Sequence, residues 1–346
     1  MNNTTANQVD DGIVPLLGIN EVLYNPIDPV FFLIIIKCIC CSIGIPLNVS
    51  IAVTIIRHEQ FRSKPRKIFL LGIIVSNLSF FIPALIILIY WSWFPVESLC
   101  KTYVTFVGVP QSLLLSNMLL ALIDRYLAVN DPMAHRDKMT VRLACAIVIL
   151  SSVFIVLLLK FVYVARLIPL RCDVQPIHSN ILAAILVTLF LSCIAMNVIV
   201  YRQTKIILRR DSRTLSPTGS EDVPPNAERI TVVNNINEST SLNELSVINR
   251  PMSIHVDRRK TLEMEVEATC TLIIGVTSLF VTVCPIFILL LTIIICQLVF
   301  SDGDLAECRN LTWLMTYFKE LGSVHAVYSP LIFLMRNKEL RVSLFG

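Results

Sequence analysis

Long apolar runs constrain this sequence more than any single motif does. There are seven, and each spans about 20 residues or more, the length that a helix needs to cross the hydrocarbon core of a bilayer. A helix satisfies its own backbone groups in lipid, whereas the strands of a membrane barrel would alternate in polarity along each run. We therefore predict an all-α bundle of seven transmembrane helices, at about 30–56, 68–92, 101–126, 143–165, 179–203, 266–298 and 311–335.

The overall composition agrees with a membrane protein. Hydrophobic residues make up 55% of the 346 residues and charged residues only 16%, which is more apolar surface than a soluble domain can hide. The net charge of +4 is too small to indicate nucleic-acid binding. The 11 cysteines show no spacing typical of a metal site, and several lie inside apolar runs as small hydrophobic residues. We predict neither a metal ion nor a cofactor.

The distribution of basic residues predicts the orientation of the chain. Residues 1–29 contain no lysine or arginine, and Asn2 and Asn3 each begin an N-x-Thr glycosylation site. Most lysines and arginines lie in the loops after the first, third and fifth helices and in the tail after the seventh. By the positive-inside rule, residues 1–29 are an extracellular tail and residues 336–346 begin a cytoplasmic tail. We expect a multi-pass protein of the plasma membrane.

The segment 204–262 is the one long polar stretch between the predicted helices. It is rich in Ser, Thr, Asn and Pro and poor in aromatic residues, so it cannot bury enough apolar surface to offset the entropy lost on ordering. We predict a disordered cytoplasmic loop. Its basic ends, Arg209-Arg210 and Arg258-Arg259-Lys260, would extend the fifth and sixth helices and contact the headgroups of membrane lipids.

Short motifs follow one another along the predicted helices in a recognisable order. In chain order they are Gly44 and Asn48, Trp93 seven residues before Cys100, Asp124-Arg125-Tyr126, Cys172-Asp173-Val174, Tyr201, Glu265, Pro285, Ser329-Pro330-Leu331-Ile332-Phe333 and the segment 336–341. The set and its spacing resemble the rhodopsin-like (class A) G-protein-coupled receptors, over nearly the whole chain. The chain would be a divergent member, with a short amphipathic eighth helix from about residue 336.

The resemblance implies a disulfide bond and an activation mechanism. A bond between Cys100 and Cys172 would join an outer loop to the third helix, in an oxidising compartment. Arg125 would pair with Asp124 and with Glu265 on the sixth helix, because an arginine at the edge of a span needs a partner. Movement of the sixth helix would then free Arg125 for a heterotrimeric G protein. The alternative is that Arg125 has no role in activation and only extends its side chain to the lipid headgroups.

Further residues would serve the same movement. Pro285 and Pro330 each remove a backbone hydrogen bond inside a helix and would act as hinges. Tyr201 would point into the bundle and stabilise the opened state. Tyr126 completes the motif at the end of the third helix, and Phe333 replaces the tyrosine that the family has near the end of the seventh.

The sequence also departs from the family. The usual aspartate of the second helix is Asn77, the serine of the third is Leu114, and Ser329 replaces the asparagine before Pro330. Most of the oxygen ligands of a sodium ion are thus missing, and we predict no sodium site. The usual tryptophan of the sixth helix is Val283, so the link between ligand and hinge would be atypical.

Residues in the outer half of the bundle restrict the ligand. Val107 stands where amine receptors have an aspartate, and Ser323 stands where opsins have the retinal-binding lysine, so both classes are rejected. A tentative ligand pocket comprises Lys37, Val107, Gln111, Lys319 and Glu320, because charges within a span usually face the interior. Lys319 and Glu320 are about 100° apart on a helix, so only one could face the pocket while the other pairs with Lys37. Alternatively, all of them extend to the outer interface. A small peptide or a lipid-like molecule would fit equally well.

Three functions other than that of a G-protein-coupled receptor are conceivable for a bundle of apolar helices. A transporter would usually show an inverted repeat or broken helix pairs, and neither is evident. A receptor-shaped protein that does not signal, such as a decoy or a partner subunit, is favoured by Val283, Ser329 and Phe333 but opposed by the intact Asp124-Arg125-Tyr126. An enzyme is not expected, because no catalytic set of side chains occurs within the spans.

Overall fold

The computed structural model describes residues 31–59, 63–92, 97–130, 135, 137–167, 169–170, 176–214, 250–299, 314 and 317–345. Within these ranges all regular secondary structure is helical, as predicted. The helices are α2 (Phe31–Arg57), α4 (Pro65–Ser79), α5 (Phe81–Ser92), α6 (Glu97–Phe106), α7 (Val109–Asn130), α9 (Val141–Val164), α10 (Pro176–Thr214), α11 (Arg250–Val299), α13 (Glu320–Arg336) and α14 (Lys338–Phe345).

Six of the described helical segments are long and apolar enough to cross a membrane. They are Phe31–Arg57, Pro65–Tyr90, Glu97–Asn130, Val141–Val164, Ile181–Ile207 and Val266–Leu289. The seventh predicted span, 311–335, is only partly described, and α13 forms its second half. The predicted extracellular tail 1–29 lies outside the described residues.

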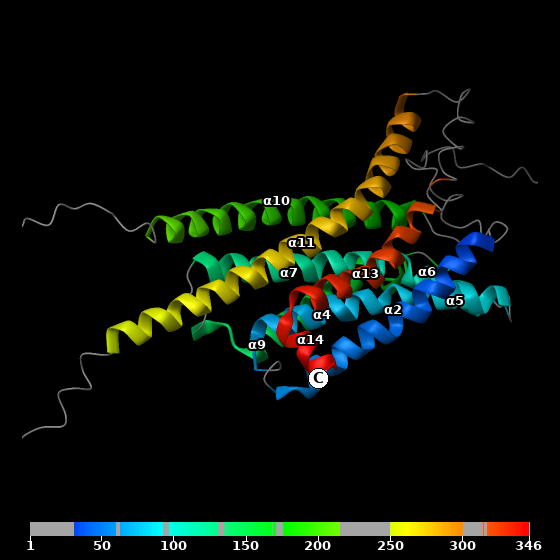
Figure 1. Ribbon diagram of the computed structural model, residues 1–346. Helices are drawn as coiled ribbons and strands as arrows, with labels where there is room; N and C mark the ends of the chain where they lie inside the picture. The colour runs from blue at the N-terminus through cyan, green and yellow to red at the C-terminus, as the bar shows by residue number, and fades with distance from the viewer. Residues whose placement is uncertain are drawn as a thin grey trace, which may run out of the picture.

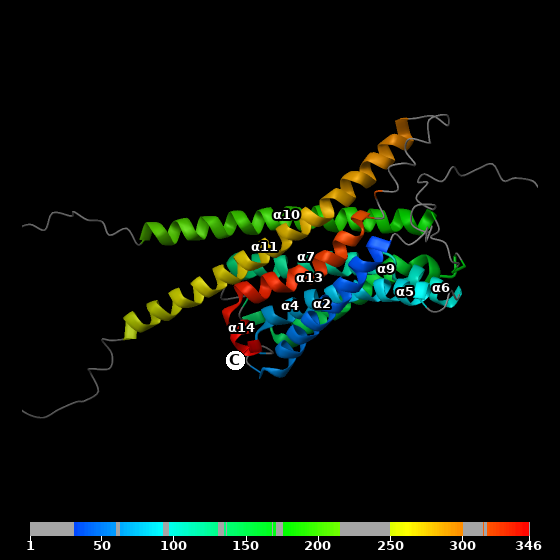
Figure 2. The same ribbon diagram turned by 45° about the vertical axis from the view of Figure 1, so that its right-hand side comes forward.

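The helices lie side by side as a bundle, with α7 near its centre (Figures 1 and 2). α7 packs against α4, α9 and α10, while α13 packs against α2 and α11. The short helix α14 turns back against α2 and buries Leu340 there. Helices α10 and α11 project beyond the other helices at one end of the bundle (Figure 1).

Side chains are sorted by whether they face the bundle or the lipid. Leu114, Met118 and Leu122 of α7 are fully buried in the main apolar cluster. By contrast, Leu150 and Phe154 of α9 are about two-thirds exposed. In water such exposed residues would be unfavourable, but they suit a surface that faces hydrocarbon.

Two predicted helices are each divided in the structure. The second consists of α4 and α5, separated at Phe80. The third consists of α6 and α7, separated at Val107 and Gly108. Gly108 has a φ of 77°, a conformation that residues with a Cβ adopt only at a cost, and Pro110 follows two residues later.

The fifth and sixth helices extend into the segment 204–262, which the sequence predicts to be disordered. α10 continues to Thr214, and α11 begins at Arg250. The basic ends of this segment therefore belong to helices, because strong helix formers such as Lys, Arg and Leu continue the helical hydrogen bonding beyond the membrane. Residues 215–249 lie outside the described part of the chain.

Three buried asparagines join neighbouring helices through hydrogen bonds. The Asn48 amide of α2 donates to the carbonyls of Gly44, at 2.8 Å, and Ala326, at 2.9 Å. Asn117 of α7 donates to Ser76 Oγ of α4 at 2.7 Å. Asn77 donates to Ser329 Oγ of α13 at 3.5 Å. Asn77 and Ser329 stand at two of the positions where the resemblance leads us to expect sodium ligands to be replaced. In the structure these two residues form a neutral contact between an amide and a hydroxyl.

A buried ion pair joins α2 to α13. Lys37 Nζ lies 2.6 Å from Glu320 Oε1, and both side chains are less than a tenth exposed. Two charges taken out of water at this depth stabilise the bundle only as a pair, since each alone would carry the full cost of desolvation. Lys37 and Glu320 therefore neutralise each other, and the sequence-based alternative that both extend to the interface is wrong for them.

We predict that removing one member of this pair destabilises the protein more than removing both. Lys37→Met or Glu320→Gln should each lower the free energy of unfolding by about 3–5 kcal/mol, because the remaining charge stays buried without a partner. The double variant Lys37→Met/Glu320→Leu should recover most of that loss. Thermal unfolding of the purified protein in detergent measures both effects.

The exposed pair Glu97–Lys101 on α6 provides the matched control. Its atoms are 2.8 Å apart, but the two side chains are 72% and 40% exposed. Its removal should change the unfolding temperature little, because solvent screens such a pair. Strictly additive losses in the Lys37/Glu320 double variant would contradict the proposed coupling.

Candidate functional site

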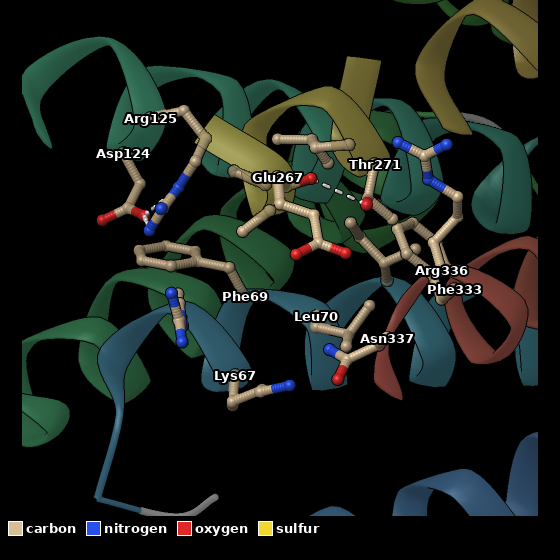
Figure 3. Close-up of a pocket in the computed structure, with 15 residues that line it drawn as sticks. Lys67, Phe69, Leu70, Asp124, Arg125, Glu267, Thr271, Phe333, Arg336 and Asn337 are labelled. Carbon is tan, nitrogen blue, oxygen red and sulfur yellow. Dashed lines mark hydrogen bonds and ion pairs between the residues drawn. The ribbon is translucent and has the colours of Figure 1, made fainter. Parts of the chain in front are cut away.

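A cavity of about 290 Å³ opens between four helices at the end of the bundle where α7 ends (Figure 3). α4, α7, α11 and α13 all contribute to its wall. The lining residues are Arg66, Lys67, Phe69, Leu70, Ile73, Ala121, Asp124, Arg125, Glu267, Ala268, Thr271, Leu272, Phe333, Arg336 and Asn337. Its floor is apolar and its rim is charged.

Arg125 and Asp124 form a buried ion pair at one side of this cavity. Arg125 Nη2 lies 2.6 Å from Asp124 Oδ2 and Nε lies 3.1 Å from the same oxygen. Their side chains are 7% and 2% exposed. The guanidinium group therefore lies back against its neighbour in the chain, as expected from the resemblance, and its charge is neutralised locally.

A third residue, His135, completes this cluster. Its Nε2 lies 2.9 Å from Asp124 Oδ1, the carboxylate oxygen that does not bind Arg125. His135 belongs to the loop between α7 and α9, and its side chain is 15% exposed. Asp124 is thus held from both sides. The sequence analysis did not identify His135, because this residue lies outside the apolar spans and its contact with Asp124 depends on how the segment between α7 and α9 folds.

The sixth helix contributes an acidic residue, Glu267, to the wall of the cavity. Its carboxylate points into the cavity between Arg125 and Arg336 (Figure 3). Thr271 fixes this turn of α11 by donating to the Glu267 carbonyl at 2.9 Å. The sequence analysis selected Glu265 for contact with Arg125. The side chain of Glu265 lies outside the described part of the structure, so that contact stays a prediction.

The predicted hinge residues lie inside helices that touch each other. Pro285 is inside α11 and Pro330 inside α13, and α11 changes direction in its orange part in Figure 1. The two helices approach closely at Gly275, where an added Cβ would lie 3.1 Å from the Phe333 ring. Tyr328 of α13 also donates its hydroxyl to the Ser278 carbonyl of α11 at 3.0 Å. Phe333 itself is 4% exposed.

The two tyrosines of the predicted machinery are less buried than this core. Tyr201 is 52% exposed, so the prediction that it points into the bundle is wrong for this structure. Its ring lies 6.0 Å from Lys205 Nζ, one turn further along α10, so the two side chains share the outer surface of that helix. Tyr126 is half-buried and packs against the main apolar cluster.

The structure divides the tentative ligand pocket. Lys37 and Glu320 bind each other, which leaves Val107, Gln111 and Lys319. Val107 is 9% exposed and borders the joint between α6 and α7. Gln111, one turn further along α7, is half-buried, and its Oε1 has no hydrogen-bond partner among the described atoms. Lys319 precedes α13 and is half-buried.

Two polar residues near this region were missed. Lys160 lies within the apolar run of α9, is 6% exposed, and contacts His178 at the start of α10. A lysine inside an apolar span is visible in the sequence, and Lys160 belongs with Lys37 and Lys319 among the charged residues of the predicted spans. His178 falls just before the predicted fifth span. His325 of α13 is fully buried, and its Nδ1 lies 3.0 Å from the Tyr328 hydroxyl.

The expected disulfide is described at one end only. Cys100 on α6 is disulfide-bonded, but Cys172 lies outside the described residues, so its pairing with Cys172 remains a prediction. No group of three His, Cys, Asp or Glu side chains suited to a metal ion occurs in the described part of the chain.

Comparison with known proteins identifies the family. Residues 47–333 match the model of the seven-transmembrane receptors of the rhodopsin family, which is more than half of the chain. No curated protein matches the chain at a significant level. Members of this family are multi-pass receptors of the plasma membrane with a signalling role, not enzymes, and in general they join a ligand to a G protein. The chain, with its bundle of apolar helices, belongs to the rhodopsin family of seven-transmembrane receptors.

Proposed function

We propose that this protein binds an extracellular ligand and activates a heterotrimeric G protein through a movement of α11. The observation that carries this proposal is the cavity at the end of α7, which holds Arg125 next to a wall made by α11. In the proposed orientation the N-terminus is extracellular, and the cavity opens toward the cytoplasm.

The geometry supports α11 as the moving part. α11 lines the cavity with Glu267 and Thr271, while α4 and α7, which pack against each other, form other parts of its wall. A helix with one face on lipid can swing outward without colliding with another helix, whereas α7 is enclosed by other helices. An outward swing of α11 would enlarge the cavity and expose Arg125.

Arg125 would then exchange partners. Its planar guanidinium has five N–H donors, and in the structure two of its nitrogens bind one carboxylate oxygen of Asp124. A segment of the G protein that entered the enlarged cavity would offer carbonyl or carboxylate oxygens to the same donors. The change of partner is favourable only if the segment also fills the apolar floor formed by Phe69, Leu70 and Ile73.

The outer side supports a ligand with hydrogen-bonding groups in an otherwise apolar body. Gln111 offers an unpaired acceptor, Lys319 offers a cation near the entrance, and Val107 is apolar. A small peptide or a lipid-like molecule combines these properties. Lys37 and Glu320 neutralise each other and do not need a ligand for this.

We predict that Arg125→Ala abolishes G-protein activation. Because the guanidinium group supplies the donors for the partner, basal second-messenger output in transfected cells should fall to the level of cells with empty vector. Surface expression must be matched by antibody labelling. Lys101→Ala, an exposed position on α6 at the other end of the same span, provides the control and should leave output unchanged.

Output from Arg125→Ala equal to that of the wild type would contradict the proposal. Wild-type output indistinguishable from that of the empty vector, in the absence and presence of peptide and lipid libraries, would favour the decoy alternative.

We also predict that His135→Ala raises basal output about two- to fivefold. Loss of one hydrogen bond to Asp124 removes about 1 kcal/mol from the contact that holds Arg125 in place. His135→Gln, which keeps a donor, should have a smaller effect. In an Asp124→Asn background, His135→Ala should add little, because its carboxylate partner is absent; equal effects in both backgrounds would show that His135 does not act through Asp124.

A further inference from the structure

We propose that Lys160 is a positioning residue that holds a built-in break in the third membrane helix. The break lies between α6 and α7, far from the cavity of Arg125. Lys160 reaches it from α9, and the outer end of the receptor is assembled around this contact. This inference goes beyond G-protein activation and does not depend on which ligand the receptor binds.

Backbone geometry shows that the third helix is interrupted. α6 ends at Phe106 and α7 begins at Val109. Pro110 has no N–H, so the Phe106 carbonyl loses the donor that a continuous helix would supply. Gly108, with its φ of 77°, turns the chain between the two helices. The joint is also packed tightly, since a Cβ on Gly108 would collide with Leu182 of α10.

An interruption at this depth leaves backbone carbonyls in need of donors. Water is scarce inside a membrane protein, so irregular backbone is tolerated there only when other protein groups satisfy it. Lys160 Nζ supplies donors to two other carbonyls at this joint. It lies 3.1 Å from the Val107 carbonyl and 3.4 Å from the Val104 carbonyl. The ammonium thus caps the carboxyl end of α6, where the helix dipole also favours a cation.

The third donor of the ammonium binds α10. His178 Nε2 lies 3.2 Å from Lys160 Nζ, and because an ammonium has only donors, this ring nitrogen accepts and the imidazole is neutral. His178 is fully buried, and its ring lies against Tyr163 at a centroid distance of 5.0 Å. One side chain of α9 therefore connects the end of α6, the joint and the start of α10.

The surroundings exclude a simple surface lysine. Lys160 is 6% exposed and is enclosed by an apolar cluster that includes Val104, Leu159 and Leu182. Among the ion pairs that join described residues, none contains Lys160. A buried ammonium is unfavourable without acceptors, so the two carbonyls and the imidazole stabilise its charge while it satisfies them.

The contact has a consequence for the whole span. α6 bears the disulfide-bonded Cys100, and α7 bears Gln111 one turn below the joint and Arg125 at its far end. Lys160 therefore sets the angle at which the outer segment meets the helix of the arginine. Without it, α6 would lose its anchor while α7 stays packed in the core.

Hydrogen–deuterium exchange of the purified receptor in detergent tests this role directly. In Lys160→Met, which keeps the side-chain length but has no donor, amides in a peptide covering residues 101–112 should exchange about tenfold faster than in the wild type. Peptides from α4 and α13 should be unchanged. Lys101→Met is the control, because its lysine lies on α6 and points away from the joint in the exposed Glu97 pair; it should not accelerate exchange at residues 104–112.

A second background separates this role from a general need for Lys160 in folding. In Pro110→Ala, which keeps Gly108 and so adds no Cβ against Leu182, the third helix can regain the backbone hydrogen bond to Phe106, so adding Lys160→Met should have little effect on exchange or on surface expression. If Lys160→Met alone is not expressed, recovery of expression in this background supports the proposal. Unchanged exchange at residues 101–112, faster exchange in all peptides, or an equal loss in both backgrounds would overturn it.

Discussion

The structure depends on one constraint: inside the membrane, every polar group must find its partner within the bundle. Three contacts of buried charges show how this is met. Lys37 binds Glu320 across α2 and α13, Lys160 binds carbonyls at the joint in the third helix, and Arg125 binds Asp124. Because lipid offers no hydrogen bonds, these contacts select one packing among the many that apolar side chains alone would allow.

The same constraint bears on the end of the bundle where α7 ends, which is the part that the proposed activation would change. In the middle of the bundle, polar groups bind partners on other helices, as Asn48 and Asn117 do. Arg125 binds its own neighbour in the chain, Asp124, which also contacts His135 in the segment between α7 and α9. The cavity beside it is closed on one side by α11. The proposed movement of α11 would open this end while the rest of the bundle keeps its contacts.

The sequence predicted the helices well, because a twenty-residue apolar run has few other solutions in a membrane. It also predicted the ion pair of Arg125 and Asp124, and a partner for Lys37 on the seventh helix without deciding between Lys319 and Glu320, since a buried charge needs a partner. It missed Lys160 and His135, whose roles depend on which helices become neighbours. Gly108 and Pro110 are visible in the sequence as residues that can interrupt a helix. The apolar run continues across them, however, so the sequence predicts one continuous helix there.

The most direct test of the central claim is the distance between α7 and α11 at the cytoplasmic end. Spin labels are attached to cysteines introduced at Leu127 and Val266, in a variant without other reactive cysteines. Pulsed electron paramagnetic resonance spectroscopy in lipid nanodiscs then reports the distance between the two labels. Addition of a nucleotide-free heterotrimeric G protein should produce a population with a longer distance, and Arg125→Ala should suppress it. An unchanged distance distribution with G proteins of every class would contradict activation by movement of α11.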